Sequence, residues 1–343
     1  MSGAARPRTF HSADSAHAPE PAAVFPFPSA ADVFAAAARV RGFVRRTPLE
    51  RSAWLSGIVG TDVHLKLENL QRTGSFKLRG AYNAIASLPP ERRARGLVTA
   101  SAGNHGQGVA LAASLIGIRP VVFVPRATPQ NKKRRIARFG AELREVDGGW
   151  DETHAAAEKH AAATGAWYVH AFSDPAVVAG QGTVGLEIVE DLPEVKTIIV
   201  PVGGGGVIGG VGVFARAVGG IRVVGVQTDE TTGMHASFAA GSLASPAYGP
   251  TICEGLTGDV DERSLALARE VVDDLVLVPE ASVRRAVRAL YVEEGLVAEG
   301  SAAVAAAALM EGAVPGLEGP IALVLTGGNL DARRLAEILS DDS

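Results

Sequence analysis

The sequence predicts an α/β protein whose strands form open parallel sheets, and three observations support this fold class. Short apolar runs typical of buried strands alternate with segments of helical periodicity over most of the chain after residue 96. The connections between these segments are short, as between parallel strands joined by crossover helices on both faces of a sheet. The chain has 343 residues, which is enough for two domains with separate cores.

The N-terminal part contains fewer predicted elements than the rest. Residues 1–27 hold many Ala, Pro and Ser residues without helical or apolar patterning, which predicts a disordered tail that lacks the apolar segment of a signal peptide. Periodicity then predicts a helix over 30–40 and a strand over 63–67. A turn at 72–75 leads into a helix that begins near Phe76, for which Ser75 is the expected N-cap.

Strands and helices alternate after this first pair. Strands are predicted at 97–100, 121–124 and 142–146, and helices at 103–116, 130–139 and 151–163. A second series has strands at 167–169, 196–202 and 221–227 with helices at 176–190 and 207–217. Residues 233–261 are less regular; helices follow at 262–272, 282–294 and 300–311, then a strand at 321–325 and a helix at 331–339.

Composition excludes several classes of protein. No run approaches the ~20 uninterrupted apolar residues of a membrane span, which predicts a soluble protein. The net charge of −4 provides no global basic field for nucleic acid or anionic lipid. The single Cys253 excludes an intrachain disulfide, which fits a reducing cytoplasm. The eight histidines show no metal-ligand spacing, so no metal site is predicted.

Lys77 is the first candidate for chemistry. It falls in the first turn of the helix that begins near Phe76, where the positive end of the helix disfavours an ammonium and lowers the lysine pKa. A neutral amine can form a Schiff base with an aldehyde cofactor. On position alone, an ordinary surface lysine is the alternative.

Three Gly-rich segments follow strands, where open parallel sheets bind their ligands. In residues 99–108, the amides and the Ser101 hydroxyl at a helix N-terminus form a candidate carboxylate pocket, and the Asn104 amide could bond an aromatic hydroxyl. In residues 201–207, four glycines let backbone amides surround a phosphate. In residues 325–329, Thr326 could direct its hydroxyl into the same cleft. Each segment alone also fits a Gly-rich turn.

A dinucleotide-binding fold is the alternative from another class. The loop at 201–207 has no Lys-Ser/Thr ending, so a nucleoside triphosphate loop is not expected. Asp229, however, follows the next strand at roughly the distance of a ribose-binding acid. An oxidoreductase or a non-catalytic nucleotide-binding protein would use this loop and leave Lys77 idle. The basic run at 132–135 with Arg138 is interpreted as a solvated helix face.

The motifs SFKLRGA at 75–81, SAGNHGQG at 101–108, VPVGGGG at 200–206 and TGGN at 326–329 occur together and in this order. In this combination the chain resembles the pyridoxal-phosphate enzymes of the tryptophan-synthase-β type, and within them the serine/threonine dehydratases and serine racemases. The resemblance runs from about Arg46 to Asp331. It implies a small domain at about 97–170 inserted in a large one formed by 28–96 and 171–343, with pyridoxal 5′-phosphate in the cleft between them.

The resemblance also implies roles for individual residues. Lys77 would carry the cofactor and remove the substrate α-proton. Phe76 would pack beside the cofactor ring, Asn104 would bond its 3-hydroxyl, Gly203, Gly204, Gly205, Gly206 and Val207 would hold its phosphate, and Thr326 would face its pyridine nitrogen. Ser101, Asn104 and His105 would hold the substrate carboxylate. A hydroxyl at Thr326 cannot stabilise a pyridinium as a carboxylate can, which favours expulsion of a β-hydroxyl.

The implied activity is an ammonia-lyase reaction that dehydrates and deaminates a β-hydroxy amino acid such as L-threonine or L-serine. Another β-elimination, a β-replacement or a racemase reaction is the alternative within the family. A cytoplasmic homodimer is expected. Departures from the family pattern occur at 298–302, where dehydratases often carry Glu-Pro-Ser/Thr, and at Thr326. His154 and Ala102 are departures as well, because racemases carry an arginine at the first position and a serine at the second. Gln227 and Gly233 replace the carboxylates of cation-activated members.

Overall fold

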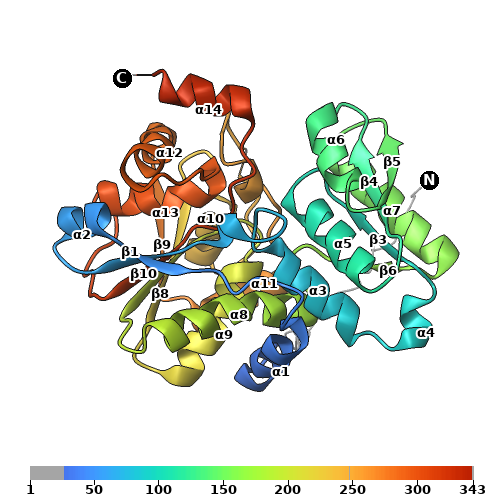
Figure 1. The fold of residues 1–343 in the computed structure, drawn as a ribbon, viewed down its shortest axis with the longest axis horizontal. Coiled ribbons are helices and arrows are strands. Elements are labelled where there is room, and N and C mark those ends of the chain that lie inside the picture. The colour runs from blue at the N-terminus through green and yellow to red at the C-terminus, as the bar shows by residue number, and fades with distance from the viewer. Residues whose placement is uncertain (1–26, 247, 342–343) are drawn as a thin grey trace, which may run out of the picture.

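The computed structural model describes residues 27–246 and 248–341, so the tail predicted for residues 1–27 lies outside the described residues except for Phe27. Two sheets lie side by side and helices cover both faces of each (Figure 1). The α/β class with mainly parallel strands is confirmed. No helix in the described part of the chain is both long and apolar enough to cross a membrane.

The larger sheet has six strands in the order β1-β2-β10-β7-β8-β9. The strands are β1 (Leu49–Ser52), β2 (Val63–Lys66), β10 (Ile321–Val324), β7 (Thr197–Pro201), β8 (Arg222–Thr228) and β9 (Asp274–Val278). Neighbouring strands are parallel except for β1, which pairs antiparallel with β2 at one edge. The antiparallel edge strand and β9 are absent from the elements predicted above.

The smaller sheet has four parallel strands in the order β5-β4-β3-β6. They are β5 (Glu142–Val146), β4 (Val121–Pro125), β3 (Leu97–Ala100) and β6 (Trp167–Tyr168). All four fall between β2 and β7 in the chain, as the predicted insertion requires. We call residues 97–170, which carry this sheet, the small domain, and the rest of the described chain the large domain; where each domain ends stays a prediction.

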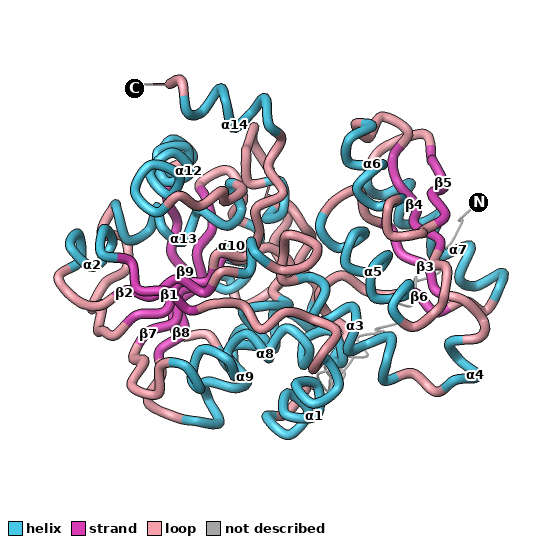
Figure 2. The backbone as a smooth tube through the Cα atoms, viewed as in Figure 1, coloured by secondary structure: helices cyan, strands magenta, loops and turns pink. Residues whose placement is uncertain are grey.

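Helices cover the small sheet on two sides (Figure 2). One side packs against α5 (Asn104–Leu115) and α6 (Gln130–Ala137) through a buried cluster that includes Ala110, Val122 and Ile136. The other side packs against α7 (Trp150–Thr164) through a cluster that includes Val98 and Ala157. The N-terminus of α5 therefore points from the carboxyl end of β3 toward the large domain.

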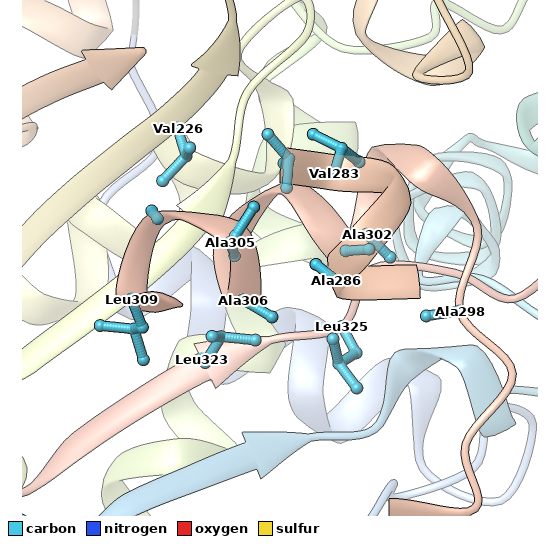
Figure 3. Close-up of a cluster of buried hydrophobic side chains, with 14 of the residues drawn as sticks. Val226, Val283, Ala286, Ala298, Ala302, Ala305, Ala306, Leu309, Leu323 and Leu325 are labelled. Atoms are coloured by element: carbon cyan, nitrogen blue, oxygen red, sulfur yellow. The ribbon is translucent and has the colours of Figure 1, made fainter. Parts of the chain in front are cut away.

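The large sheet also lies between two layers. One layer holds α1 (Ala30–Val40), α8 (Pro175–Asp191), α9 (Gly206–Val218) and α11 (Glu262–Val271), and the other holds α2 (Ala53–Val59), α12 (Glu280–Glu294) and α13 (Gly300–Met310). In α13, Ala302, Ala305 and Ala306 lie between the sheet and α12 (Figure 3). Their small side chains let this helix lie close to both neighbours.

The helix that carries Lys77 connects the two domains. It is α3 (Lys77–Ser87), and a cluster including Leu78 and Ile85 packs it against Val109 of α5. Ser75 was predicted as its N-cap, and this is wrong: the N-cap is Phe76, which makes no side-chain capping bond. Ser75 instead forms an isolated bridge with Gly327, so the chain reaches α3 as an extended segment.

The remaining elements are short. They are α4 (Pro90–Arg93), α10 (Gly233–Ala240) and α14 (Ala332–Leu339), with single 3-10 turns η1 (Glu68–Leu70) and η2 (Glu254–Leu256). Of these, α14 and η2 border the space between the two domains.

Candidate active site

Lys77 is half-buried at the start of α3, on the side that faces the small domain. Its Nζ donates a hydrogen bond to the Ala171 carbonyl oxygen at 2.9 Å and lies 5.2 Å from the centre of the Phe76 ring. Burial lowers the pKa of Lys77 to about 8. The lowered pKa agrees with the sequence-based expectation, but burial causes it rather than the helix end. With a pKa of about 8, roughly a tenth of the amine is in its neutral, nucleophilic form at pH 7, far more than of an ordinary lysine.

The N-terminus of α5 lies beside this lysine. Its N-cap, Gly103, makes no side-chain capping bond, so the first amides of α5 are available to an anion. The Ser101 hydroxyl accepts a hydrogen bond from the Gly103 amide at 3.2 Å, which places it at the mouth of this helix. A carboxylate pocket at residues 99–108 stays a prediction, and these groups are the donors that it would use.

The side chain of His105 is engaged by the protein, so the predicted contact with a substrate carboxylate would fall to its backbone amide. Its imidazole is buried, with Nε2 2.9 Å from the Val169 carbonyl oxygen. Burial, followed by the charge of Lys77, lowers the pKa of His105 to about 3. The neutral ring therefore cannot offer a positive charge to a carboxylate. The backbone amide of His105, in the first turn of α5, remains as its possible contact.

A second helix N-terminus, that of α9, follows the four glycines. Gly205 is the N-cap with φ of +87°, a left-handed conformation that favours glycine, and it makes no side-chain capping bond. A Cβ at Gly204 would lie 2.6 Å from the Phe172 ring, so packing as well as ligand access requires glycine there. The first amides of α9 form a site suited to a phosphate.

Thr326 lies next to the start of α3, which carries Lys77. The Phe76 amide donates to the Thr326 carbonyl oxygen at 3.1 Å, so the end of β10 and the start of α3 are held together. The Thr326 hydroxyl is buried, and it donates a long hydrogen bond, of 3.5 Å, to the Ser301 carbonyl oxygen. This hydroxyl is weakly engaged by the protein and can serve a ligand.

Glu299 and Asn329, to which the sequence assigned no role, both contact Asn104. Asn104 Nδ2 donates to Glu299 Oε1 at 2.6 Å, and Asn329 Nδ2 donates to Asn104 Oδ1 at 2.7 Å. Burial raises the pKa of Glu299 to about 7. Glu299 had been noted only as part of a departure from the family pattern at 298–302. No local pattern marks it, because its partner lies 195 residues away.

A cavity of about 290 Å³ opens between the domains beside these residues. Glu299, Ser301 and Asn329 line it from the large domain, and Asn131 and Lys132 of α6 line it from the small domain. Lys77 is not a lining residue. It is nevertheless close to the cavity, because it lies two residues after Ser75, which forms a bridge with Gly327. Gly327 in turn lies directly next to the Glu299 carboxylate.

The interpretation of the basic run at 132–135 with Arg138 as a solvated face holds for the exposed Arg134 and Arg138, but it is wrong for the other three residues. Lys133 is buried and donates to Glu145 at 2.8 Å, within the small domain. Lys132 pairs with Glu254 of η2 at 2.5 Å, and Arg135 donates to Asn329 at 3.3 Å. These last two contacts cross from α6 to the large domain at the mouth of the cavity.

Residues 40–327 match the family model described as pyridoxal-phosphate dependent enzyme. The chain belongs to this family. An L-threonine ammonia-lyase of Thermotoga maritima is 42% identical over 315 residues, 90% of this chain and 77% of that protein. The catabolic L-threonine dehydratase TdcB of Escherichia coli is 37% identical over 313 residues, 90% and 94% of the two chains.

Solved structures show the same fold. The serine racemase of maize has a TM-score of 0.87 and 32% sequence identity, and the match covers 90% of this chain and 96% of that one. The fold-type expectation drawn from the four motifs is therefore confirmed. The cofactor of this pyridoxal-phosphate-dependent enzyme is also the one that the motifs predict.

The residues present fit pyridoxal phosphate. An aldehyde that carries a phosphate requires a neutral amine and a cradle of amide donors, and Lys77 and the uncapped N-terminus of α9 supply them. The buried Ser75 Oγ has no hydrogen-bond partner within the described residues. An orphaned hydroxyl two residues before Lys77 is a further sign of a site built for a polar ligand.

Asp229, the best feature of the dinucleotide alternative, has another role in this pyridoxal-phosphate-dependent enzyme. Its Oδ1 accepts a hydrogen bond from the Glu280 amide at 3.0 Å, at the N-terminus of α12. A carboxylate in that position stabilises the helix. The dinucleotide-binding alternative loses the residue that favoured it.

Proposed function

We propose that this enzyme catalyses the β-elimination of water from L-threonine or L-serine, with release of a 2-oxo acid and ammonia. The observation that carries the proposal is a half-buried Lys77 of lowered pKa, whose Nζ bonds the Ala171 carbonyl oxygen next to Phe172, the residue that packs on Gly204 and Gly206 at the uncapped N-terminus of α9. The named activities of the relatives at 42% and 37% identity support it.

We assign the residues as follows. The amides of Gly203, Gly204, Gly205, Gly206 and Val207 bind the cofactor phosphate, Phe76 packs beside the ring, Asn104 bonds its 3-oxygen and Thr326 faces its pyridine nitrogen. The N-terminus of α5, with Ser101, Asn104 and the His105 amide, holds the substrate carboxylate. When bound, pyridoxal phosphate supplies an acceptor for the electron pair left at the substrate α-carbon.

Lys77 takes the α-proton on its neutral Nζ, for which its pKa of about 8 is suited. The α-proton and the β-hydroxyl leave the substrate as water. The resulting enamine takes a proton at its β-carbon, and water then replaces nitrogen to give the 2-oxo acid and ammonia. One water is lost and one is taken up, so the net products are the 2-oxo acid and ammonia.

The proposal is tested by measuring 2-oxo acid and ammonia release across a panel of amino acids. We expect L-threonine and L-serine to give equal amounts of both products, and amino acids without a β-leaving group to give neither. Release from a β-chloro or O-acetyl substrate alone would identify a different elimination. We also propose that the enzyme acts as a homodimer in the cytoplasm, which sedimentation and fractionation would test.

Racemisation is expected to be much slower than elimination. A racemase needs an acid on the face of the cofactor opposite Lys77. Ala102, where similar racemases carry a serine, packs against the buried cluster of the small domain and has no exchangeable proton. Chiral chromatography of an L-serine reaction should show D-serine forming roughly 10²-fold more slowly than pyruvate, the loss expected without a general acid. Comparable rates would contradict this assignment.

Turnover should not depend on a divalent cation. Gln227, at the position of one carboxylate in cation-activated members, uses its amide in packing: Nε2 donates to the Val202 carbonyl oxygen at 3.0 Å, and Oε1 accepts from the His235 amide at 2.7 Å. Hard cations need anionic oxygens. We expect the rate to be unchanged after dialysis against a chelator. A strong loss that magnesium restores would refute the prediction.

A further inference from the structure

The Asn104 side chain is held on both sides of its amide by the large domain. Its Nδ2 donates to Glu299 Oε1 at 2.6 Å, and its Oδ1 accepts from Asn329 Nδ2 at 2.7 Å. An amide has two donor hydrogens on nitrogen and two lone pairs on oxygen. One hydrogen of Nδ2 is therefore left for a ligand, and the position of nitrogen and oxygen is not interchangeable.

The orientation of Asn329 is fixed in the same way. Its Nδ2 also donates to the Thr73 carbonyl oxygen at 2.9 Å, and its Oδ1 accepts from Arg135 at 3.3 Å. If the Asn329 amide were rotated by half a turn, its nitrogen would face the Arg135 donor and its oxygen would face the Thr73 carbonyl oxygen. Asn329 therefore presents a hydrogen to Asn104 Oδ1 rather than an oxygen to Asn104 Nδ2.

Glu299 is the group that selects the orientation of Asn104 from the other side. Glu299 Oε1 accepts the Asn104 Nδ2 hydrogen at 2.6 Å, while Asn104 Oδ1 is taken by the donor Asn329 Nδ2, so the two contacts together fix which end of the amide faces Glu299. The backbone at Glu299 is held in place, because its amide donates to the Gly327 carbonyl oxygen at 3.0 Å. A Cβ on Gly327 would lie 2.5 Å from Glu299 Oε1, so the carboxylate lies directly against this turn.

The network also crosses the cleft. Asn104 and Arg135 belong to the small domain, whereas Glu299, Asn329 and Thr73 belong to the large domain. A small domain that moved away from the large one would leave Asn104 without both constraints. The orientation of a cofactor ligand is thus set by groups of the opposite domain.

We propose that Glu299 is a positioning residue, which turns the Asn104 amide so that its remaining N–H faces the 3-oxygen of the bound cofactor. This proposal rests on the cofactor contact assigned to Asn104 above. In this proposal Glu299 acts through Asn104. Burial raises the pKa of Glu299, and the hydrogen bond from Asn104, which favours the charged form, opposes that rise.

A double-mutant cycle on the full-length enzyme tests the proposal, with the dissociation constant of pyridoxal 5′-phosphate and the visible absorption of the bound cofactor as readouts. Glu299→Met removes the acceptor with little change in volume, and we expect affinity to fall about tenfold. Glu299→Gln keeps an acceptor oxygen and should restore most of the affinity. In an Asn104→Ala background, Glu299→Met should have no further effect.

A matched control is Glu337→Met, which alters an exposed carboxylate of α14 that lines the same cavity outside the network; it should leave cofactor affinity unchanged. Circular dichroism and unfolding curves establish that each variant folds. Additive effects of Glu299→Met and Asn104→Ala would overturn the inference, as would an effect of Glu299→Met no larger than that of Glu337→Met. If Asn104→Ala itself binds cofactor normally, the contact assigned to Asn104 is wrong. The proposed function fails separately, if the wild-type enzyme releases no 2-oxo acid.

Discussion

Lys77→Ala is expected to abolish both the visible absorption of the lysine-bound cofactor and elimination from L-threonine. The variant loses the amine that binds the aldehyde and the base that takes the α-proton, and a positioned base alone contributes roughly 10²–10⁴-fold. The fold should be little affected, because the lysine side chain makes a single hydrogen bond, to the Ala171 carbonyl oxygen. Absorption spectra and a 2-oxo acid assay measure both losses.

Lys196→Ala provides the matched control, because Lys196 is exposed just before β7 and lies outside the proposed site. It should retain the visible band and the wild-type rate. A Lys77→Ala variant that kept the visible band and turned over threonine would show that another amine holds the cofactor.

Arg79→Leu is expected to produce the largest loss of stability. The guanidinium of Arg79 is fully buried and bonds Glu68 at 2.7 and 2.9 Å and Glu187 at 2.7 and 2.8 Å. Burial opposes its charge, but these two carboxylates outweigh burial and raise the pKa of Arg79. In Arg79→Leu, Glu187 would keep its pair with the buried Lys66, whereas Glu68 would lose both of its bonds to Arg79. Breaking a buried ion pair costs about 3–5 kcal/mol.

Arg51→Leu is the control for this prediction, because Arg51 pairs with Asp62 at 2.7 Å with both side chains 52% exposed. Exposed pairs contribute about 0–1 kcal/mol. Denaturant unfolding curves give both values. If Arg79→Leu were as stable as Arg51→Leu, the buried ion pairs of Arg79 would not stabilise the fold as predicted. Arg79 lies two residues after Lys77, so a weakened cofactor affinity should accompany the loss of stability.

Much of the fold could be predicted because its signals are local. Apolar runs and helical periodicity identify β3, β4, β7 and most helices within two residues of their ends. The strand β9 was missed, although its five residues contain two valines and two leucines, because a short apolar run between two helices also fits a continuing helix or a loop. The direction of β1 depends on its pairing with β2, which its four residues do not specify.

The candidate site also has a part that local sequence patterns predict and a part that they do not. Lys77 and the glycines at 203–206 were found because each is part of a contiguous motif at the end of a strand. Glu299 and Asn329 were given no role, although Asn329 lies in the TGGN motif, because each acts by contact with Asn104, 195 and 225 residues away in the chain. The contacts of Lys132 and Arg135 with the large domain were missed for the same reason. A charge run does not indicate which of its members meets a partner.

The most direct test of the account is the position of the cofactor on the chain. The enzyme is loaded with pyridoxal 5′-phosphate, reduced with borohydride to make the lysine attachment permanent, and digested for peptide mapping by mass spectrometry. We expect the phosphopyridoxyl group on Lys77, in the peptide that begins after Arg72. A label on Lys66, which lies buried against Glu187 at 2.7 Å, or the absence of any label, would contradict the site described here.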